Sequence, residues 1–209
     1  MQLIGSARLL PVIVVDNGGP AEALANALLD GGLAVAEVTF RTTGAANALE
    51  QMAGISGMCV GAGTVVHARQ VDLAVDAGAQ FVVSPGLSRA VVKRCNERGV
   101  PVFPGVATAS DLIGSMELDI DVVKLFPAAQ LGGPGMVAAL AAPFPTMRFI
   151  PTGGITAATA TSYLEHKAVL AVGGSWMVPS DAIRGRKWDH ISRLTRESVL
   201  MVDALEGDR

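Results

Sequence analysis

Short apolar segments rich in β-branched residues recur along the chain, and Ala- and Leu-rich stretches with helical spacing separate them. The starts of these segments lie 20 to 27 residues apart. Two of the helical stretches are Ala21–Asp30, which stops at Gly31-Gly32, and Ala68–Ala77, which stops at Gly78. The pattern predicts eight strands: Leu9–Val15, Ala34–Phe40, Met58–Gly63, Phe81–Gly86, Pro101–Val106, Asp121–Pro127, Arg148–Gly153 and Leu170–Trp176.

Apolar strands that alternate with helices are typical of parallel sheets whose two faces are both covered. Eight such units predict an α/β fold, a single-domain (β/α)8 TIM barrel over residues 1–209. The alternative is an open doubly wound sheet, which usually carries G-x-G-x-x-G after its first strand. Here Val15 is followed instead by Asp16-Asn17-Gly18-Gly19-Pro20. A barrel places its chemistry at the carboxyl ends of its strands, so the search for a site narrows to those ends.

The composition restricts the classes of partner and compartment. The net charge is −3, and Lys and Arg form no block, so the sequence predicts binding of neither nucleic acid nor an anionic membrane. No apolar segment is long enough to span a bilayer, and Met1-Gln2-Leu3-Ile4 lacks the features of a secretion signal. Cys59 and Cys95 are too few for a disulfide framework, which favours a reducing compartment. We therefore expect a soluble, cytoplasmic protein.

Lys124 is the lysine that does not fit a solvent-exposed role. It lies in Val122-Val123-Lys124-Leu125-Phe126-Pro127, late in a strand that is predicted to be buried. Burial disfavours the charged ammonium, and the neutral amine is the form that attacks a carbonyl carbon. The sequence therefore predicts a Schiff-base nucleophile. The alternative is a structural lysine paired with a buried acid.

Glu37 is the corresponding acid, in Val35-Ala36-Glu37-Val38-Thr39-Phe40-Arg41. Side chains alternate along a strand, so Glu37, Thr39 and Arg41 are predicted to share one face. Inside a barrel, the carboxylate could carry protons and the guanidinium could bind a carboxylate through two hydrogen bonds. The alternative is a Glu37–Arg41 salt bridge with a purely structural role.

Two glycine-rich turns follow the seventh and eighth predicted strands. They are Pro151-Thr152-Gly153-Gly154-Ile155-Thr156 and Val172-Gly173-Gly174-Ser175-Trp176. Turns in these positions of a barrel commonly bind phosphate, because glycine lets backbone N–H groups approach the oxygens. The three histidines, at positions 67, 166 and 190, lack metal-ligand spacing, and Ser175 lacks a G-x-S-x-G context, so neither a metal site nor a hydrolase triad is predicted.

Seven motifs in order give the chain a resemblance to the family of 2-dehydro-3-deoxy-phosphogluconate (KDPG) aldolases, which overlap in activity with 4-hydroxy-2-oxoglutarate aldolases. The motifs are Pro11-Val12-Ile13-Val14-Val15, Glu37-Val38-Thr39-Phe40-Arg41-Thr42, Val60-Gly61-Ala62-Gly63-Thr64-Val65, Ser84-Pro85-Gly86-Leu87, Lys124-Leu125-Phe126-Pro127-Ala128, Pro151-Thr152-Gly153-Gly154-Ile155 and Gly173-Gly174-Ser175-Trp176.

The resemblance implies a class I aldolase of the Entner–Doudoroff pathway, without metal or cofactor and homotrimeric. It implies an imine on Lys124 and acid/base catalysis by Glu37. It further implies that Arg41 and Thr64 hold the pyruvate-end carboxylate, with Pro85 beside it and Phe126 against the imine. The phosphate would be held by the backbone around Gly153, Gly154, Gly174 and Ser175. The sequence departs from the family at Ala129, where many relatives carry Glu.

Three other functions remain open at this stage. A phosphogalactonate aldolase would have the opposite C4 stereochemistry, but that relative tends to lack the Arg of the second-strand motif. A non-catalytic phosphate-binding barrel would gain nothing from two buried charges. A metal-dependent aldolase would be sensitive to a chelator.

Overall fold

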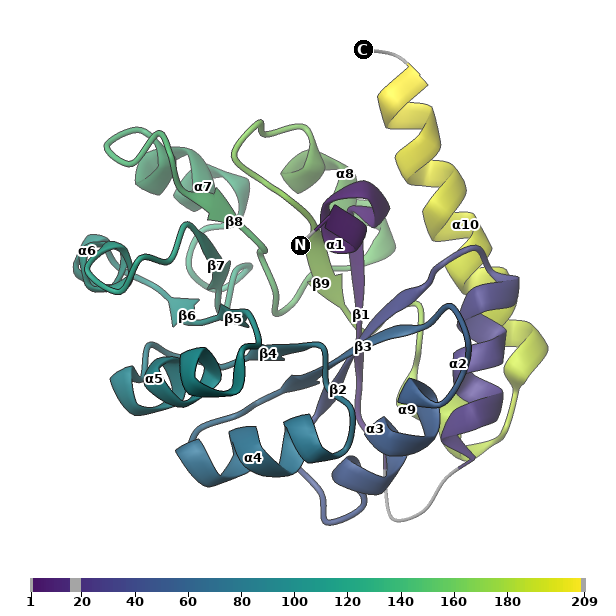
Figure 1. The fold of residues 1–209 in the computed structure, drawn as a ribbon. Coiled ribbons are helices and arrows are strands. Elements are labelled where there is room, and N and C mark those ends of the chain that lie inside the picture. Colours follow the sequence, from purple (N-terminus) through teal and green to yellow (C-terminus); the bar gives the residue numbers. More distant parts are fainter. Residues whose placement is uncertain (1, 16–19, 208–209) are drawn as a thin grey trace.

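The computed structural model describes residues 2–15 and 20–207, and its strands lie inside a surround of helices (Figure 1). The strands are β1 Leu9–Ile13, β2 Val35–Thr39, β3 Cys59–Gly63, β4 Phe81–Val83, β5 Val102–Phe103, β6 Gly105–Val106, β7 Val122–Leu125, β8 Arg148–Phe149 and β9 Val172–Gly174. The helices are α1 Gln2–Ala7, α2 Ala21–Asp30, α3 Ala45–Ala53, α4 Ala68–Asp76, α5 Arg89–Arg98, α6 Ala109–Met116, α7 Pro134–Ala141, α8 Ala157–Leu164, α9 Ser180–Arg184 and α10 Trp188–Gly207.

The predicted elements all have counterparts in the structure. The predicted helices Ala21–Asp30 and Ala68–Ala77 are α2 and α4. The predicted strands are present but shorter, and the fifth is divided into β5 and β6 at Pro104. The stretch Asp16–Gly19, which follows the first predicted strand, lies outside the described residues.

The strand pairings are all parallel, but they form two sheets rather than one closed ring. One sheet has the order β5-β4-β3-β2-β1-β9, and the other has the order β6-β7-β8. Proline has no N–H to donate, and Pro104 marks the change of partner from β4 to β7. On the other side, isolated bridges join Phe149 to Val169 and Thr152 to Gly173. A parallel α/β fold is therefore confirmed, whereas the closed eight-stranded ladder is not formed in full.

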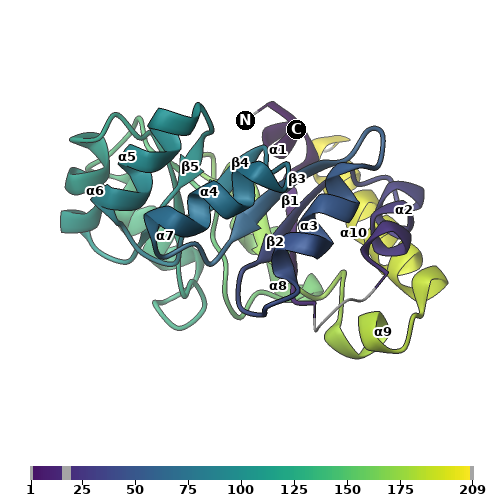
Figure 2. The ribbon, with the colours of Figure 1, turned by 60° about the horizontal axis from the view of Figure 1, so that its bottom comes forward.

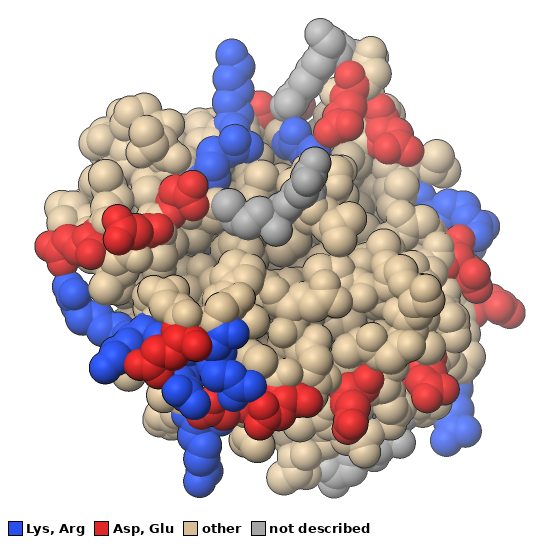
Figure 3. All heavy atoms as spheres, in the orientation of Figure 1, with Lys and Arg blue, Asp and Glu red and all other residues tan. Residues whose placement is uncertain are grey.

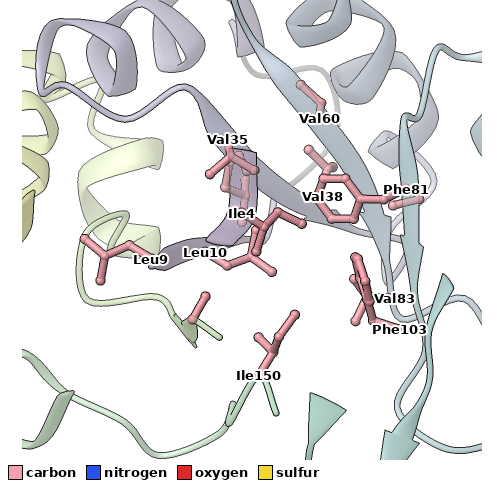
Figure 4. Close-up of a cluster of buried hydrophobic side chains, with 14 of the residues drawn as sticks. Ile4, Leu9, Leu10, Val35, Val38, Val60, Phe81, Val83, Phe103 and Ile150 are labelled. Carbon is pink, nitrogen blue, oxygen red and sulfur yellow. The ribbon is translucent and has the colours of Figure 1, made fainter. Parts of the chain in front are cut away.

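The core lies between the strands and beneath the helices. Figure 4 shows Leu10, Val83 and Phe103 reaching into the space between the strands from the six-stranded sheet. Helix α1 adds Ile4, which lies beside Val35 and is almost fully buried. Burying a side chain of this size contributes about 1.5–3 kcal/mol. The short N-terminal helix therefore closes one end of the strand assembly.

The outer helices carry the charges. On the face seen in Figure 3, Lys and Arg are interspersed with Asp and Glu around the edge, and no extended basic area is visible. One mixed cluster joins α4 to α5, where Arg94 and Arg98 both donate to Asp72, at 2.7 Å and 2.6 Å. Helix α10 packs along α2 on the outside of the fold (Figure 2). None of the helices within the described residues is long and apolar enough to cross a membrane.

Candidate active site

The side chains of Glu37 on β2 and Lys124 on β7 meet in the interior. The Lys124 Nζ lies 3.2 Å from the Glu37 Oε1, and the two side chains are 6% and 0% exposed. Because β2 and β7 belong to different sheets, this contact crosses the space that the two sheets enclose. Lys124 and Glu37 are therefore in contact, as expected both for a catalytic pair and for the alternative of a structural lysine paired with a buried acid. The predicted alternative, a Glu37–Arg41 salt bridge, does not form, since the partner of Glu37 is Lys124.

The Glu37 carboxylate occupies a tightly enclosed position. A Cβ atom at Gly63, on the neighbouring strand β3, would overlap this carboxylate, so the glycine provides the space that Glu37 fills. The second oxygen, Glu37 Oε2, is buried and has no hydrogen-bond partner within the described chain. A buried acceptor without a partner is costly unless a bound molecule supplies a donor. This oxygen is thus available to a substrate hydroxyl or a water.

Lys124 is held by its strand and faces an aromatic ring. Its backbone N–H donates to the carbonyl of Pro104 at 2.9 Å, and its Nζ lies 5.4 Å from the centre of the Phe126 ring. A cation at that distance from an aromatic face is stabilised by the ring electrons. Lys124 pairs in register with Gly105, and the carbonyl of Pro85 packs against Gly105 so closely that no Cβ would fit. Pro85 is therefore one strand away from Lys124.

A cavity of about 270 Å³ lies at the carboxyl ends of these strands. It contains most of the predicted substrate and phosphate residues. Its lining residues are Val12, Val14, Arg41, Phe126, Thr152, Gly153, Gly154, Ile155, Gly174 and Ser175. Larger grooves exist elsewhere, one of about 630 Å³ between α2 and α10. Neither that groove nor the smaller cavity is lined by Lys124 or Glu37, but the smaller cavity is lined by Phe126, whose ring centre lies 5.4 Å from Lys124 Nζ. The smaller cavity is therefore the candidate substrate site.

Arg41 is exposed at the cavity and is oriented by a threonine. The Arg41 Nε donates to Thr64 Oγ1 at 3.2 Å, so the two residues predicted to hold a carboxylate are in contact. Thr64 has a φ of 58°, a left-handed conformation that is unusual for a β-branched residue. Strained backbone of this kind tends to occur at functional sites. The contact leaves the terminal nitrogens of Arg41 for a ligand.

The glycine turn after β8 presents backbone donors. Gly153 and Gly154 have φ values of 101° and 74°, which side chains with a Cβ rarely adopt. None of the backbone hydrogen bonds of the described chain uses the N–H groups of Gly153, Gly154 or Ile155 as donors. Unpaired backbone N–H groups at a glycine turn are typical of anion-binding sites, so the phosphate prediction for this turn is chemically consistent. Ala129, the departure from the family pattern, packs directly against Gly154.

The structure adds residues that the sequence analysis did not assign to the site. Thr152 lines the cavity, and its hydroxyl lies where a Cβ at Gly173 would be. The Trp176 ring lies directly behind Gly174. Both residues stand within the glycine motifs, but no local signal separates them from ordinary turn residues. Among the described residues, no three His, Cys, Asp or Glu side chains cluster closely enough to hold a metal ion.

Comparison with known proteins decides the family. The family model described as "Aldolase: KDPG and KHG aldolase" matches residues 2–194. The chain belongs to the KDPG and KHG aldolase family. Members of this family are carbon–carbon lyases, and the chain is accordingly an aldolase. The predicted resemblance is confirmed over nearly the whole chain.

Three similar proteins extend this result. A 2-dehydro-3-deoxy-phosphogluconate aldolase of Treponema pallidum is 43% identical over 202 residues, which are 95% of each chain. The KDPG aldolase of Legionella pneumophila, solved with pyruvate captured at low pH as a covalent carbinolamine intermediate, has a TM-score of 0.90 and 38% identity, covering 94% of this chain and 96% of its own. The corresponding aldolase of Zymomonas mobilis, solved with 3-phosphoglycerate, has a TM-score of 0.88 and 39% identity, covering 95% and 93%.

Proposed function

We propose that this family member cleaves 2-dehydro-3-deoxy-6-phosphogluconate to pyruvate and glyceraldehyde 3-phosphate through an imine on Lys124. The observation that carries the proposal is the buried contact between Lys124 Nζ and Glu37 Oε1 at 3.2 Å, next to the Phe126 ring that lines the cavity. A buried ion pair contributes little net stability. A catalytic role therefore explains the buried Lys124–Glu37 pair better than a role in stabilising the fold.

Imine formation uses both members of the pair. Glu37 accepts a proton from the Lys124 ammonium, and the neutral amine adds to the C2 carbonyl carbon of the substrate. The resulting carbinolamine loses its hydroxyl as water, with a proton supplied by Glu37, and leaves a protonated imine. The Phe126 ring, 5.4 Å from Nζ, stabilises this cation as it stabilises the ammonium. The Legionella relative, with its covalent carbinolamine, supports the first half of this sequence.

The protonated imine makes C3–C4 cleavage possible, because it accepts the electrons of the bond that breaks. Glu37 accepts the proton of the C4 hydroxyl, the C3–C4 bond breaks, and its electrons pass through C2 to the imine nitrogen. Glyceraldehyde 3-phosphate leaves and an enamine remains. Glu37 returns the proton to C3, and water hydrolyses the pyruvate imine to regenerate Lys124. Each positioned proton transfer typically contributes a factor of about 10² to 10⁴ in rate.

The remaining site residues would bind the two ends of the substrate. Arg41, oriented by Thr64, would bind the carboxylate beside the keto group through two hydrogen bonds. Pro85, which packs against Gly105 beside Lys124, would lie next to that carboxylate. The backbone at Gly153, Gly154, Gly174 and Ser175 would hold the phosphate at the other end of the cavity. The Zymomonas relative, solved with 3-phosphoglycerate, supports binding of a phosphorylated acid.

Two alternative substrates have the same 2-keto acid end, which is released as pyruvate. Cleavage of 4-hydroxy-2-oxoglutarate to pyruvate and glyoxylate needs the imine but no phosphate, and the family description includes it. The phosphogalactonate epimer differs at C4. Arg41 in the second-strand motif favours the gluconate form, and comparing turnover of the two epimeric phosphates tests this choice. A binder without chemistry is disfavoured, because it has no use for a buried lysine and an acid in contact.

We further propose that the chain forms a closed barrel, works in the cytoplasm and assembles as a homotrimer. The bridges at Phe149 and Thr152, together with the continuous chain through Pro104, support a closed single-domain (β/α)8 barrel with local gaps in its ladder. Both cysteines are free thiols, which supports a reducing, cytoplasmic compartment. The resemblance implies a homotrimer, and sedimentation velocity of the purified chain would test it.

Borohydride reduction in the presence of pyruvate tests the nucleophile. We expect a reduced pyruvyl adduct on the peptide that carries Lys124, and no adduct in Lys124→Ala. Lys93→Ala is the matched control, because the Lys93 side chain is 80% exposed on α5, and it should keep the adduct. Absence of an adduct in the unmodified chain, under conditions where pyruvate binds, would leave the binder as the better explanation.

A further inference from the structure

The loop after β9 is fastened to the outer helix α10 by a tryptophan. The Trp176 indole N–H donates to Ser198 Oγ at 3.0 Å, and the Ser198 hydroxyl donates to the carbonyl of Leu194 at 2.9 Å. Ser198 is only 4% exposed, so this short chain of hydrogen bonds is shielded from water. Figures 1 and 2 show α9 and α10 on the outside of the fold, where α10 runs past the segment that follows β9. The indole therefore has a fixed position relative to α10.

The same indole packs behind Gly174, which lines the cavity. A Cβ atom at Gly174 would overlap carbon atoms of the six-membered ring of Trp176, so the ring and the Gly174 backbone are in direct contact. Gly174 and Ser175 line the cavity on their other side. A shift of the indole would therefore move the backbone that faces the cavity.

We propose that Trp176, held by Ser198, is a positioning residue that sets affinity for the phosphate end of the substrate. The inference rests on the proposed function and adds a specificity element to it. Backbone donors bind phosphate well only when they are held in place, because a loop that must be ordered on binding loses affinity. Lys124 and Glu37 lie on β7 and β2, outside this contact. Loss of the indole contact should thus weaken binding of phosphorylated substrates more than that of unphosphorylated ones. It should leave imine formation on Lys124 unchanged.

Ser198→Ala is the test variant, because it removes the acceptor without touching the cavity. A neutral hydrogen bond contributes about 0.5–1.5 kcal/mol, so we expect KM for the phosphorylated substrate to rise by roughly two- to twelvefold. We expect kcat for that substrate, and kcat/KM for 4-hydroxy-2-oxoglutarate, to stay within about twofold. Trp176→Phe loses the indole N–H and also the six-membered ring that lies against Gly174, so it should raise KM at least as much. Adding Ser198→Ala to Trp176→Phe should raise KM no further, because the hydrogen bond is already lost.

Thr195→Val is the matched control on the same helix. Thr195 is fully buried and its hydroxyl has no hydrogen-bond partner within the described chain, so its removal breaks no bond. This variant should bind the phosphorylated substrate as the unmodified chain does. Equal losses for both substrates in Ser198→Ala, in proportion to a lower melting temperature, would mean that the contact only stabilises the fold and would overturn the inference.

Exchange of the pyruvate methyl hydrogens with solvent deuterium separates failure of this inference from failure of the proposed function. Exchange requires the enamine, and it does not involve the phosphate subsite. Exchange in the unmodified chain and in Ser198→Ala, together with the KM difference, supports the inference. Exchange in both without a KM difference overturns it and leaves the aldolase mechanism in place. Absence of exchange in the unmodified chain overturns the proposed function and the inference with it.

Discussion

Gly63→Ala should disable the acid/base group without changing any charged residue. The added Cβ would lie 2.5 Å from Glu37 Cγ and 2.6 Å from Cδ, and closer still to Oε1. Ordinary van der Waals contact begins at 3.4 Å, so the carboxylate must move by about 1 Å or rotate away. Glu37 is fully buried, and its only hydrogen bond within the described chain runs to Lys124, so this movement breaks the pair.

The expected loss follows from that displacement. A misplacement of about 1 Å at a reacting group can cost about 10²-fold in rate. Loss of a positioned proton-transfer group costs about 10² to 10⁴. We therefore expect kcat for cleavage to fall by at least about 100-fold. The reduced pyruvyl adduct on Lys124 should still form at a slower rate, since the lysine itself keeps its place on β7.

Gly61→Ala is the matched control, two residues earlier on the same strand. Its Cβ would overlap the Phe81 ring, which belongs to the core and not to the site. Overpacking of this kind costs about 1–3 kcal/mol, so we expect a lower melting temperature and less than about a tenfold change in kcat per folded molecule. The assay couples pyruvate release to its enzymatic reduction and normalises the rate to folded protein. Equal kcat values for Gly63→Ala and the unmodified chain, with the fold intact, would refute the assigned role of Glu37.

Three further predictions concern binding, acid stability and thiol chemistry. Arg41→Lys should raise KM and the inhibition constant of pyruvate by about tenfold or more, because an ammonium cannot form two parallel hydrogen bonds to a carboxylate. An unchanged pyruvate constant would exclude Arg41 as the carboxylate ligand. Hydrogen bonds from Arg94 and Arg98 hold the pKa of the Asp72 carboxyl below its ordinary value of 3.8. The resulting stabilisation is complete above that value and is lost as pH falls through the lowered pKa, so Asp72→Asn should flatten the decline of urea midpoints below about pH 4. Parallel declines in the two proteins would contradict this. Burial raises the pKa of the Cys95 thiol to about 11. At about pH 8 only roughly one such thiol in a thousand is ionised, so a thiol reagent should label Cys95 only after unfolding. Rapid labelling of the native chain would show that this thiol is accessible.

Much of the fold and of the site could be predicted from the sequence, because the relevant signals are local. Apolar periodicity and the glycines that stop each helix predicted α2 and α4 to within a residue. Alternation along β2 predicted that Glu37, Thr39 and Arg41 share one face, and an isolated lysine in an apolar strand identified Lys124. Each of these inferences depends only on residues within a few positions of one another.

Tertiary structure decided what depends on contacts between distant segments. Glu37 could have paired with Arg41 four positions away, and instead it pairs with Lys124, 87 positions away, because β2 and β7 face each other across the interior. The change of sheet at Pro104 depends on which strands lie on either side of it. The sequence alone could not show that Gly63 makes room for a carboxylate or that Trp176 reaches α10. Both features are contacts with segments distant in the sequence, and only the folded chain brings those segments together.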